Sequence, residues 1–491
     1  MTPEGPCHDE LERFLRNMTR RRFFAQAAGS IGAGLGVAAL NSMSPRLAAA
    51  GQGGVEGIIS HPPKAKRVIY MHMEGAPSQL DLYDYKPELK AQYDIELPSS
   101  VRMGQRITGM TSGQARFPVA PSIFRFDNCP TDSGGMWLSE LLPETQKIAP
   151  HMCLVRSLHT NAINHEPGIT FFQTGHEQPG RPSFGAWSSY GLGNMSDDLP
   201  SFAVLITQGV GNMQALSSRF WGSGFLPSQH QGCRFRAGKD AVLYLNDPDG
   251  INRSTRRRML DLLGHLNQEE FAQGLDPETQ ARIEQHEMAY RMQMGVPELT
   301  DISKEPQSVL DMYGPEVHKP GSFAANCLLA RRLAERGVRF VQLYCRGWDQ
   351  HNNLPGELKT QCGLVDRAQS ALVQDLAQKG MLDETLILWA GEFGRTVYSQ
   401  GTLSATNYGR DHHPRCFSVW LAGGGIKGGL TYGKTDDFSY NIAEDPVSVH
   451  DLHATMLHLL GIDHTRLTYR HQGRDYRLTD VSGSVVRPML A

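Results

Sequence analysis

Short apolar runs rich in β-branched and aromatic residues recur along the chain and are separated by longer amphipathic stretches. Such runs are typical of parallel strands whose two faces are covered by crossover helices. The predicted strands are residues 67–73, 151–157, 202–206, 338–345, 385–390 and 416–422, and the predicted crossover helices are 323–336, 364–379 and 447–460. We therefore expect an α/β fold, a mostly parallel sheet flanked by helices. In such sheets ligands bind beyond the carboxyl ends of the strands.

Two stretches depart from this alternation. Residues 250–313 contain charged helical patterns without strands, at 254–266 and 277–294, which predicts a helical insertion. It serves either as a lid over a site or as a buttress on the sheet, and its ordinary solvated charge pattern favours the buttress. Residues 95–135 are rich in Gly, Pro and Ser with little periodicity, which predicts a long surface excursion.

The first 50 residues have the pattern of a twin-arginine signal peptide. Paired arginines, Arg20 and Arg21, precede an apolar run of small residues that ends in three alanines. That run is shorter than the roughly 20 residues that a spanning helix needs, so we expect no permanent membrane span. The alternative is a short N-terminal helix that stays attached. We expect the twin-arginine translocation machinery to export the folded protein to a periplasmic or extracellular location, leaving one domain at residues 65–480.

The net charge and the spacing of the cysteines limit the kinds of binding surface and structural site that we expect. The 491 residues carry a net charge of −3 with histidine neutral, which gives no basic surface of the kind that binds nucleic acid. Eight cysteines are scattered without a C-x-x-C pair, so neither a disulfide framework nor a zinc ribbon is expected.

Polar clusters follow the predicted strands. Strand 67–73 is followed by Glu74 and then, beyond a glycine turn, by the further oxygen donors Asp81 and Asp84, which can present carboxylates to a cation. The alternative is that Ser78 and Asp81 only cap a helix or turn.

Two further clusters follow later strands. After strand 338–345, Asp349 and His351 stand two residues apart, so an extended segment would direct both toward one metal ion. After strand 385–390, Glu392 offers a carboxylate and Arg395 offers a guanidinium fork for a tetrahedral anion. The alternatives are a solvated loop around His351 and a buried ion pair between Glu392 and Arg395.

Histidines mark the remaining clusters. Arg410, His412 and His413 precede strand 416–422, and because adjacent residues point in opposite directions one metal ion would take only one of these histidines. Residues 159–168 lead from strand 151–157 into a predicted helix whose N-terminus favours anions.

Clusters at the ends of several strands fit one convergent site better than unrelated accidents. We expect a hydrolase of a charged ester that uses a divalent metal, namely zinc, calcium or manganese, with Arg395 or Arg410 binding the anionic group. The candidate metal ligands are Glu74, Asp349, His351, Glu392, His412 and His413, and the candidate substrate-binding residues are Ser78, Gln79, Asp81 and Arg410. No Ser, Thr or Cys stands out as a nucleophile.

Residues 75–81, 347–351, 391–396 and 409–414 resemble the motifs of the domain of unknown function 1501 family, sulfatase-like proteins of the alkaline phosphatase superfamily. The resemblance covers nearly the whole chain after the leader. It implies a parallel sheet flanked by helices and a site for one or two divalent metals. Asp349, His351, Glu392 and one of His412 and His413 stand where that superfamily places ligands.

The chain also departs from the sulfatase pattern. His165 stands where sulfatases carry the Cys or Ser nucleophile, Glu74-Gly75 replaces paired aspartates, and Glu392-Phe393 replaces an Asp-His pair. A formylglycine mechanism is therefore unsupported, and His165 or a metal-activated water would replace the usual nucleophile. Two functions follow: an exported metal-dependent hydrolase of phosphate or sulfate esters, including those of polysaccharides, or a non-catalytic sulfatase-like protein that binds an anionic ligand or polysaccharide.

Overall fold

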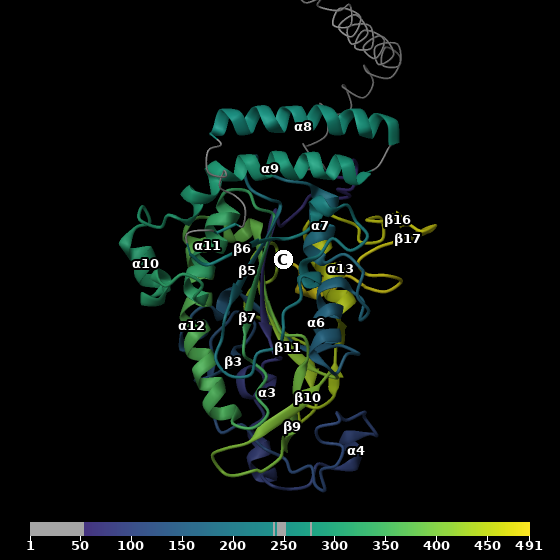
Figure 1. Ribbon diagram of the computed structural model, residues 1–491. Helices are drawn as coiled ribbons and strands as arrows, with labels where there is room; N and C mark the ends of the chain where they lie inside the picture. Colours follow the sequence, from purple (N-terminus) through teal and green to yellow (C-terminus); the bar gives the residue numbers. More distant parts are fainter. Residues whose placement is uncertain (1–53, 239–240, 243–251, 275–276) are drawn as a thin grey trace, which may run out of the picture. The chain divides into compact units, whose positions relative to one another are not determined.

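A computed structural model describes residues 54–491 except 239–240, 243–251 and 275–276. The predicted signal peptide therefore lies outside the described residues. Residues Ala50–Ala491 form one compact unit, built around a nine-stranded sheet with the strand order β12-β4-β11-β8-β1-β7-β5-β6 and β15 beside β4 (Figure 1).

The strands of this sheet are β1 (Arg67–Glu74), β4 (Met152–His159), β5 (Phe202–Thr207), β6 (Cys233–Phe235), β7 (Phe340–Arg346), β8 (Thr385–Ala390), β11 (Phe417–Ala422), β12 (Leu430–Tyr432) and β15 (Val447–Ser448). Smaller two-stranded sheets pair β2 (Phe126–Cys129) with β3 (Met136–Ser139), β9 (Gly394–Gln400) with β10 (Gly409–His413), β13 (Lys434–Thr435) with β14 (Ile442–Glu444), and β16 (Tyr469–His471) with β17 (Arg474–Tyr476). The described helices are α3 (Gln79–Leu82), α4 (Ser99–Arg102), α5 (Pro143–Gln146), α6 (His165–Thr174), α7 (Phe184–Leu192), α8 (Arg253–Gly274), α9 (Pro277–Thr300), α10 (Gln307–Tyr313), α11 (Phe323–Glu335), α12 (Leu354–Gln378) and α13 (Val449–Leu459).

The predicted fold class is confirmed, because the sheet is mostly parallel and flanked by helices. Every strand predicted from the apolar runs is present within a few residues of its predicted bounds. The last of them runs against its neighbours: β11 pairs antiparallel with both β8 and β4. Its first residues therefore lie at the edge where the parallel strands end. This brings the histidines that precede β11 to the same edge as the residues that follow β1, β7 and β8.

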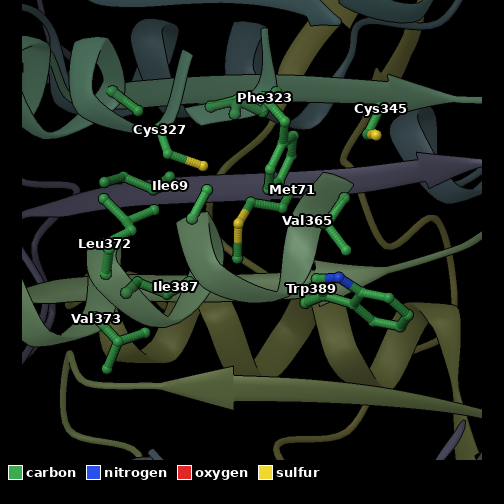
Figure 2. Packing of buried hydrophobic residues seen from close by; sticks show 14 of the residues in the cluster. Ile69, Met71, Phe323, Cys327, Cys345, Val365, Leu372, Val373, Ile387 and Trp389 are labelled. Atoms are coloured by element: carbon green, nitrogen blue, oxygen red, sulfur yellow. The ribbon is translucent and has the colours of Figure 1, made fainter. Parts of the chain in front are cut away.

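Alternation along the central strands separates two cores. In β1, Ile69 and Met71 belong to the core on one face of the sheet, whereas Val68 and Tyr70 belong to the core on the other. Figure 2 shows the first face, where Ile69 and Met71 lie beside Phe323 of α11. Both faces are buried, which is why these strands read as continuous apolar runs rather than alternating ones.

The expectation that residues 95–135 form a surface excursion is wrong in part. Leu97, Phe117 and Val119 are buried and form a third apolar cluster with Leu80 and with Val397 of β9. The segment thus supports the β9–β10 hairpin. The missing periodicity reflects an irregular backbone, and not exposure to solvent.

The helical insertion lies at the opposite edge of the sheet. The guanidinium of Arg332, near the end of α11, donates to the carbonyl of Glu298 in α9 at 2.9 Å. Because α11 ends shortly before β7 begins, α9 lies at the amino edge. Figure 1 likewise shows α8 and α9 at one end of the sheet and the β9–β10 hairpin at the other. A buttress would lie in this position, and a lid over the carboxyl edge would not.

Among the described residues, no helix is long and apolar enough to cross a membrane. All seven cysteines in this part of the chain are free thiols.

Candidate metal centre

Four side chains meet at the carboxyl edge of the sheet: His165, Asp349, His351 and His412. Their ligand atoms all lie within 4.8 Å of one another. Asp349 Oδ1 is the common point, at 3.1 Å from His165 Nε2, 2.6 Å from His351 Nε2 and 3.5 Å from His412 Nε2. Three imidazole nitrogens and one carboxylate oxygen therefore face a single small volume.

Three different parts of the fold position these four residues. Asp349 and His351 follow β7, where the chain turns through Gly347 with a φ of +101°. His165 is the first residue of α6, on the connection that leaves β4. His412 lies in β10, which leads into β11. The site is complete only because β11 runs against the other strands.

The far side of each imidazole is held by a hydrogen-bond acceptor. The acceptors are Glu392 Oε1 for His165 at 2.6 Å, Gln400 Oε1 for His351 at 2.6 Å and the carbonyl of Ile163 for His412 at 2.7 Å. Because an acceptor faces each Nδ1, each Nδ1 carries the hydrogen, and the lone pair of each neutral ring is on Nε2. All three lone pairs thus point toward the common centre, an arrangement typical of metal-binding histidines.

Asp349 is held in place by donors on both oxygens. Its Oδ2 accepts from Asn212 Nδ2 at 2.6 Å and from Gln214 Nε2 at 2.9 Å, and its Oδ1 accepts from Arg395 Nη2 at 2.7 Å. Burial alone would raise the pKa of the Asp349 carboxyl. The surrounding imidazoles and the Arg395 guanidinium outweigh burial and hold this pKa well below its usual range. The carboxyl is therefore ionised, as a metal ligand must be.

The residues present fit a divalent metal ion. Among the described residues, His165 Nε2 and His412 Nε2 make no hydrogen bond although both are buried. Ligands at about 2.1 Å from a tetrahedral zinc lie about 3.4 Å apart, close to the distances from Asp349 Oδ1 to His165 Nε2 and His412 Nε2. His351 Nε2, at 2.6 Å, would have to move outward to admit an ion. Without an ion, despite the opposing effect of burial, the neighbouring carboxylates of Asp349 and Glu392 raise the pKa of His165 to about 9, so metal binding has to displace a proton there.

Glu392 lies one layer outside this cluster. Its carboxylate accepts from His165 Nδ1 and from the backbone N–H of Gly75 at 3.0 Å, and it faces His72 Nε2 at 3.5 Å. His72 Nδ1 in turn contacts Tyr70 Oη at 2.7 Å. A buried polar chain thus runs from the cluster into strand β1, and Glu392 contacts the far nitrogen of His165 from outside the group of four.

The guanidinium of Arg395 likewise makes its hydrogen bonds to groups inside the protein. Its guanidinium donates to the carbonyls of Ala76 at 2.9 Å and Arg410 at 3.1 Å, in addition to Asp349. The side chain is 1 % exposed. It therefore orients Asp349 and joins the turns after β1 and β8, which leaves it little capacity to bind an external anion.

The other predicted residues lie outside the cluster. Asp81 and Arg410 form a fully buried ion pair at 2.7 Å. Ser78 donates to Asp81. Gln79 exchanges hydrogen bonds with the backbone of Arg395, through its side-chain nitrogen and oxygen, at 2.8 Å each. These contacts hold the β9–β10 hairpin against the turn that follows β1.

Glu74 and His413 also point elsewhere. Glu74 accepts from the backbone N–H of Gln214 at 2.8 Å, and burial with the nearby Glu392 charge raises its pKa to about 8. His413, on the opposite side of β10 from His412, contacts the carbonyl of Tyr440 at 2.7 Å. Only one of the paired histidines thus reaches the centre.

Sequence reasoning missed several supporting residues: His72, Asn212, Gln214 and Gln400. A polar His72 inside an otherwise apolar strand was the available signal for one of them. The other three stand in segments without any metal-binding spacing, and only the fold brings them to Asp349 and His351.

A family model described as protein of unknown function (DUF1501) matches residues 65–490. No curated protein is significantly similar to this chain in sequence.

Solved structures that match include the PsFucS1 sulfatase from Pseudoalteromonas sp., with 13 % identity, 81 % of this chain and 68 % of that chain covered, and a TM-score of 0.33. Ps i-CgsB in complex with k-i-k-neocarrahexaose has 12 % identity, covers 81 % of this chain and 72 % of that chain, and has a TM-score of 0.32. A mutant of TAB5 alkaline phosphatase with magnesium bound has 11 % identity, covers 74 % of this chain and 92 % of that chain, and has a TM-score of 0.29.

Proposed function

The chain belongs to the DUF1501 family of proteins of unknown function, and from that premise we propose that it is a metal-dependent hydrolase of phosphate or sulfate esters. The observation that carries the proposal is the convergence of three imidazole Nε2 atoms on Asp349 Oδ1. The tautomer of each ring is fixed by an acceptor on its far side. A structural cluster of histidines has no need for three lone pairs directed at one point.

The donor set favours zinc among the expected metals. Three imidazole nitrogens and one carboxylate oxygen suit zinc, whereas calcium prefers a shell of oxygen ligands. His165, Asp349, His351 and His412 would hold the ion. When bound, such an ion polarises an ester oxygen and lowers the pKa of a water molecule.

The protein's own groups would orient the substrate. Helix α6 begins at His165, and its N-cap residue Asn164 makes no side-chain cap hydrogen bond. Its first N–H groups and the positive end of its dipole therefore favour a tetrahedral anion beside the metal ligands. Glu392 keeps the Nε2 lone pair of His165 directed at the centre, and hydrogen bonds from Arg395, Asn212 and Gln214 hold the Asp349 carboxylate in place.

The proposal is tested on purified protein by zinc, manganese and calcium analysis and by assays on aryl phosphates and aryl sulfates. His412→Ala and His351→Ala are each expected to lower bound zinc at least about 10-fold and to abolish ester hydrolysis, because each removes one ligand. His458→Ala removes an imidazole of α13 outside the cluster and serves as the matched control. Full zinc content in both ligand variants would contradict the proposal.

The second candidate is a non-catalytic protein that binds an anionic ligand or polysaccharide. It is favoured by one observation: Arg395 and the predicted substrate-binding pair Asp81 and Arg410 are engaged in buried internal contacts. Zinc binding together with sulfated oligosaccharide binding, but no turnover of any phosphate or sulfate ester, would establish this function instead. We also propose export by the twin-arginine route, on the basis of Arg20 and Arg21 in the leader.

A further inference from the structure

Helix α8 carries an apolar stripe on its outer surface. The stripe consists of Met259, Leu262, Leu263 and Leu266, which are 45 %, 61 %, 42 % and 53 % exposed. Their spacing of three, four and seven residues places them on one face of the helix. Among the described side chains, no other helix carries exposed large apolar residues.

This stripe is separate from the face by which α8 packs on the protein. Leu260 is 5 % exposed, and Arg257 donates to Glu287 of α9 at 2.8 Å. Figure 1 shows α8 on the outer side of α9. The stripe therefore adds nothing to the described core. Apolar side chains gathered in this way on a soluble protein mark a contact surface.

The charge pattern along α8 indicates which partner the stripe contacts. Arg256 and Arg258 precede the stripe, on either side of the Arg257 that pairs with Glu287, and positions 269 and 270 after it are both glutamate in the sequence. A second copy that runs antiparallel places each basic turn near the acidic positions of the other copy. A parallel pair would place like charges together, which is unfavourable.

The register of such a pair is self-complementary. With a two-fold axis between positions 262 and 263, Met259 lies opposite the partner's position 266 and Leu262 lies opposite the partner's position 263. The same patch then serves both subunits, as a two-fold interface requires. A narrow seam of this kind also suits a facing helix better than a lipid surface, which binds a wide apolar face rich in basic residues.

We propose that two copies of this chain dimerise through antiparallel pairing of their α8 helices along Met259, Leu262, Leu263 and Leu266. A seam of four side chains from each copy buries less than a standard interface, so the dissociation constant is expected in the roughly micromolar range. The metal centre lies at the other edge of the sheet and stays accessible in the dimer.

The test is the molar mass of the full chain by sedimentation equilibrium up to about 100 μM, well above a micromolar dissociation constant. Wild type is expected to be a dimer. Leu262→Glu with Leu266→Glu is expected to weaken dimerisation at least about 100-fold, because it buries unpaired charge in the seam. The matched control is Val481→Glu, which adds a charge at an apolar side chain that is 83 % exposed and lies outside the stripe; it should leave the dimer intact.

A cysteine pair provides a second test that needs no loss of folding. Leu262→Cys is expected to form an intermolecular disulfide under mild oxidation, whereas Asp261→Cys, an exposed position beside the stripe, is not. A monomeric wild type, a dimer that persists in the double glutamate variant with an unchanged melting temperature, or equal cross-linking of both cysteine variants would each overturn the proposal. Binding of a monomeric wild type to anionic vesicles through the stripe would replace it with a membrane contact.

Discussion

The acceptors behind the imidazoles are expected to control metal affinity as much as the ligands themselves. Glu392→Gln keeps an oxygen near His165 Nδ1 but removes the negative charge. We expect zinc affinity to fall about 10- to 100-fold, the usual range for groups that orient metal-binding histidines. Competition with a chelator of known affinity measures this. Glu384→Gln removes a half-exposed carboxylate that pairs with Lys66 and is the control; equal affinities in wild type and Glu392→Gln would place Glu392 outside the metal system.

The buried carboxyl of Glu74 predicts a pH dependence of stability in the metal-free protein. Its pKa in the folded protein is about 8, raised mainly by burial from an ordinary value of 4.5. A raised pKa means that the group's stabilising contribution is complete below 4.5 and is lost as the pH rises through 8. Glu74→Gln should therefore match wild type in acid and exceed it in stability above pH 8, by at most about 5 kcal/mol.

Urea unfolding midpoints of both proteins in chelator, in acidic and in alkaline buffer, measure this difference. A variant less stable than wild type in alkaline buffer would show that Glu74 is held ionised by partners other than those seen here.

At the scale of secondary-structure elements, the β9–β10 hairpin connects packing to the metal centre. A Cβ atom at Gly409 would lie 1.6 Å from the carbonyl oxygen of His351. Gly409→Ala should push β10 away from the loop after β7, lower stability by about 2–3 kcal/mol and reduce zinc binding. Gly363→Ala, in α12 where nothing lies within 4 Å of the added atom, is the control and should be neutral or slightly stabilising. Melting temperature and zinc content measure these two effects. Intact zinc binding in Gly409→Ala would show that the position of the hairpin does not affect the metal centre.

The elements that sequence predicted well are those with a local hydrophobic pattern. β1, β7 and β8 were evident as apolar runs because both of their faces are buried. The direction of β11 was not evident from the sequence, since an apolar run has the same pattern in a parallel and in an antiparallel strand. The hairpin β9–β10 was not predicted, because its polar residues face a centre built by distant segments.

The candidate metal centre, like the fold, could be predicted from the sequence only in part. Asp349 and His351 follow from spacing alone, since residues two apart share a side. The choice between His412 and His413 depends on which side of β10 faces the centre, and the roles of Glu392 and Arg395 depend on neighbours far away in the chain. Those roles become visible only when the segments are assembled.

At the scale of the whole molecule, the proposed twin-arginine leader predicts that the protein works outside the cytoplasm. Changing Arg20 and Arg21 together to Lys should leave the precursor in the cytoplasm, because the paired arginines distinguish this leader from a general secretory one. Cell fractionation and immunoblotting of the wild type and the double variant measure the outcome. Changing Arg13 and Arg16 to Lys keeps the same charge balance and should export normally. Export of the Arg20 and Arg21 variant at the wild-type level would remove the basis for this route.

In an oxidising compartment, the seven unpaired thiols of the described residues affect how long the folded protein lasts. All but Cys233 are buried, and burial raises the pKa of Cys153 and of Cys345 to about 12, so the folded chain offers few reactive thiolates. An unfolded chain would expose them all to oxidation and mispairing. For the exported protein we propose, refolding outside the cytoplasm would therefore fail. The lifetime of each molecule there would be set by how slowly it first unfolds, a matter of kinetic barrier height and not of equilibrium.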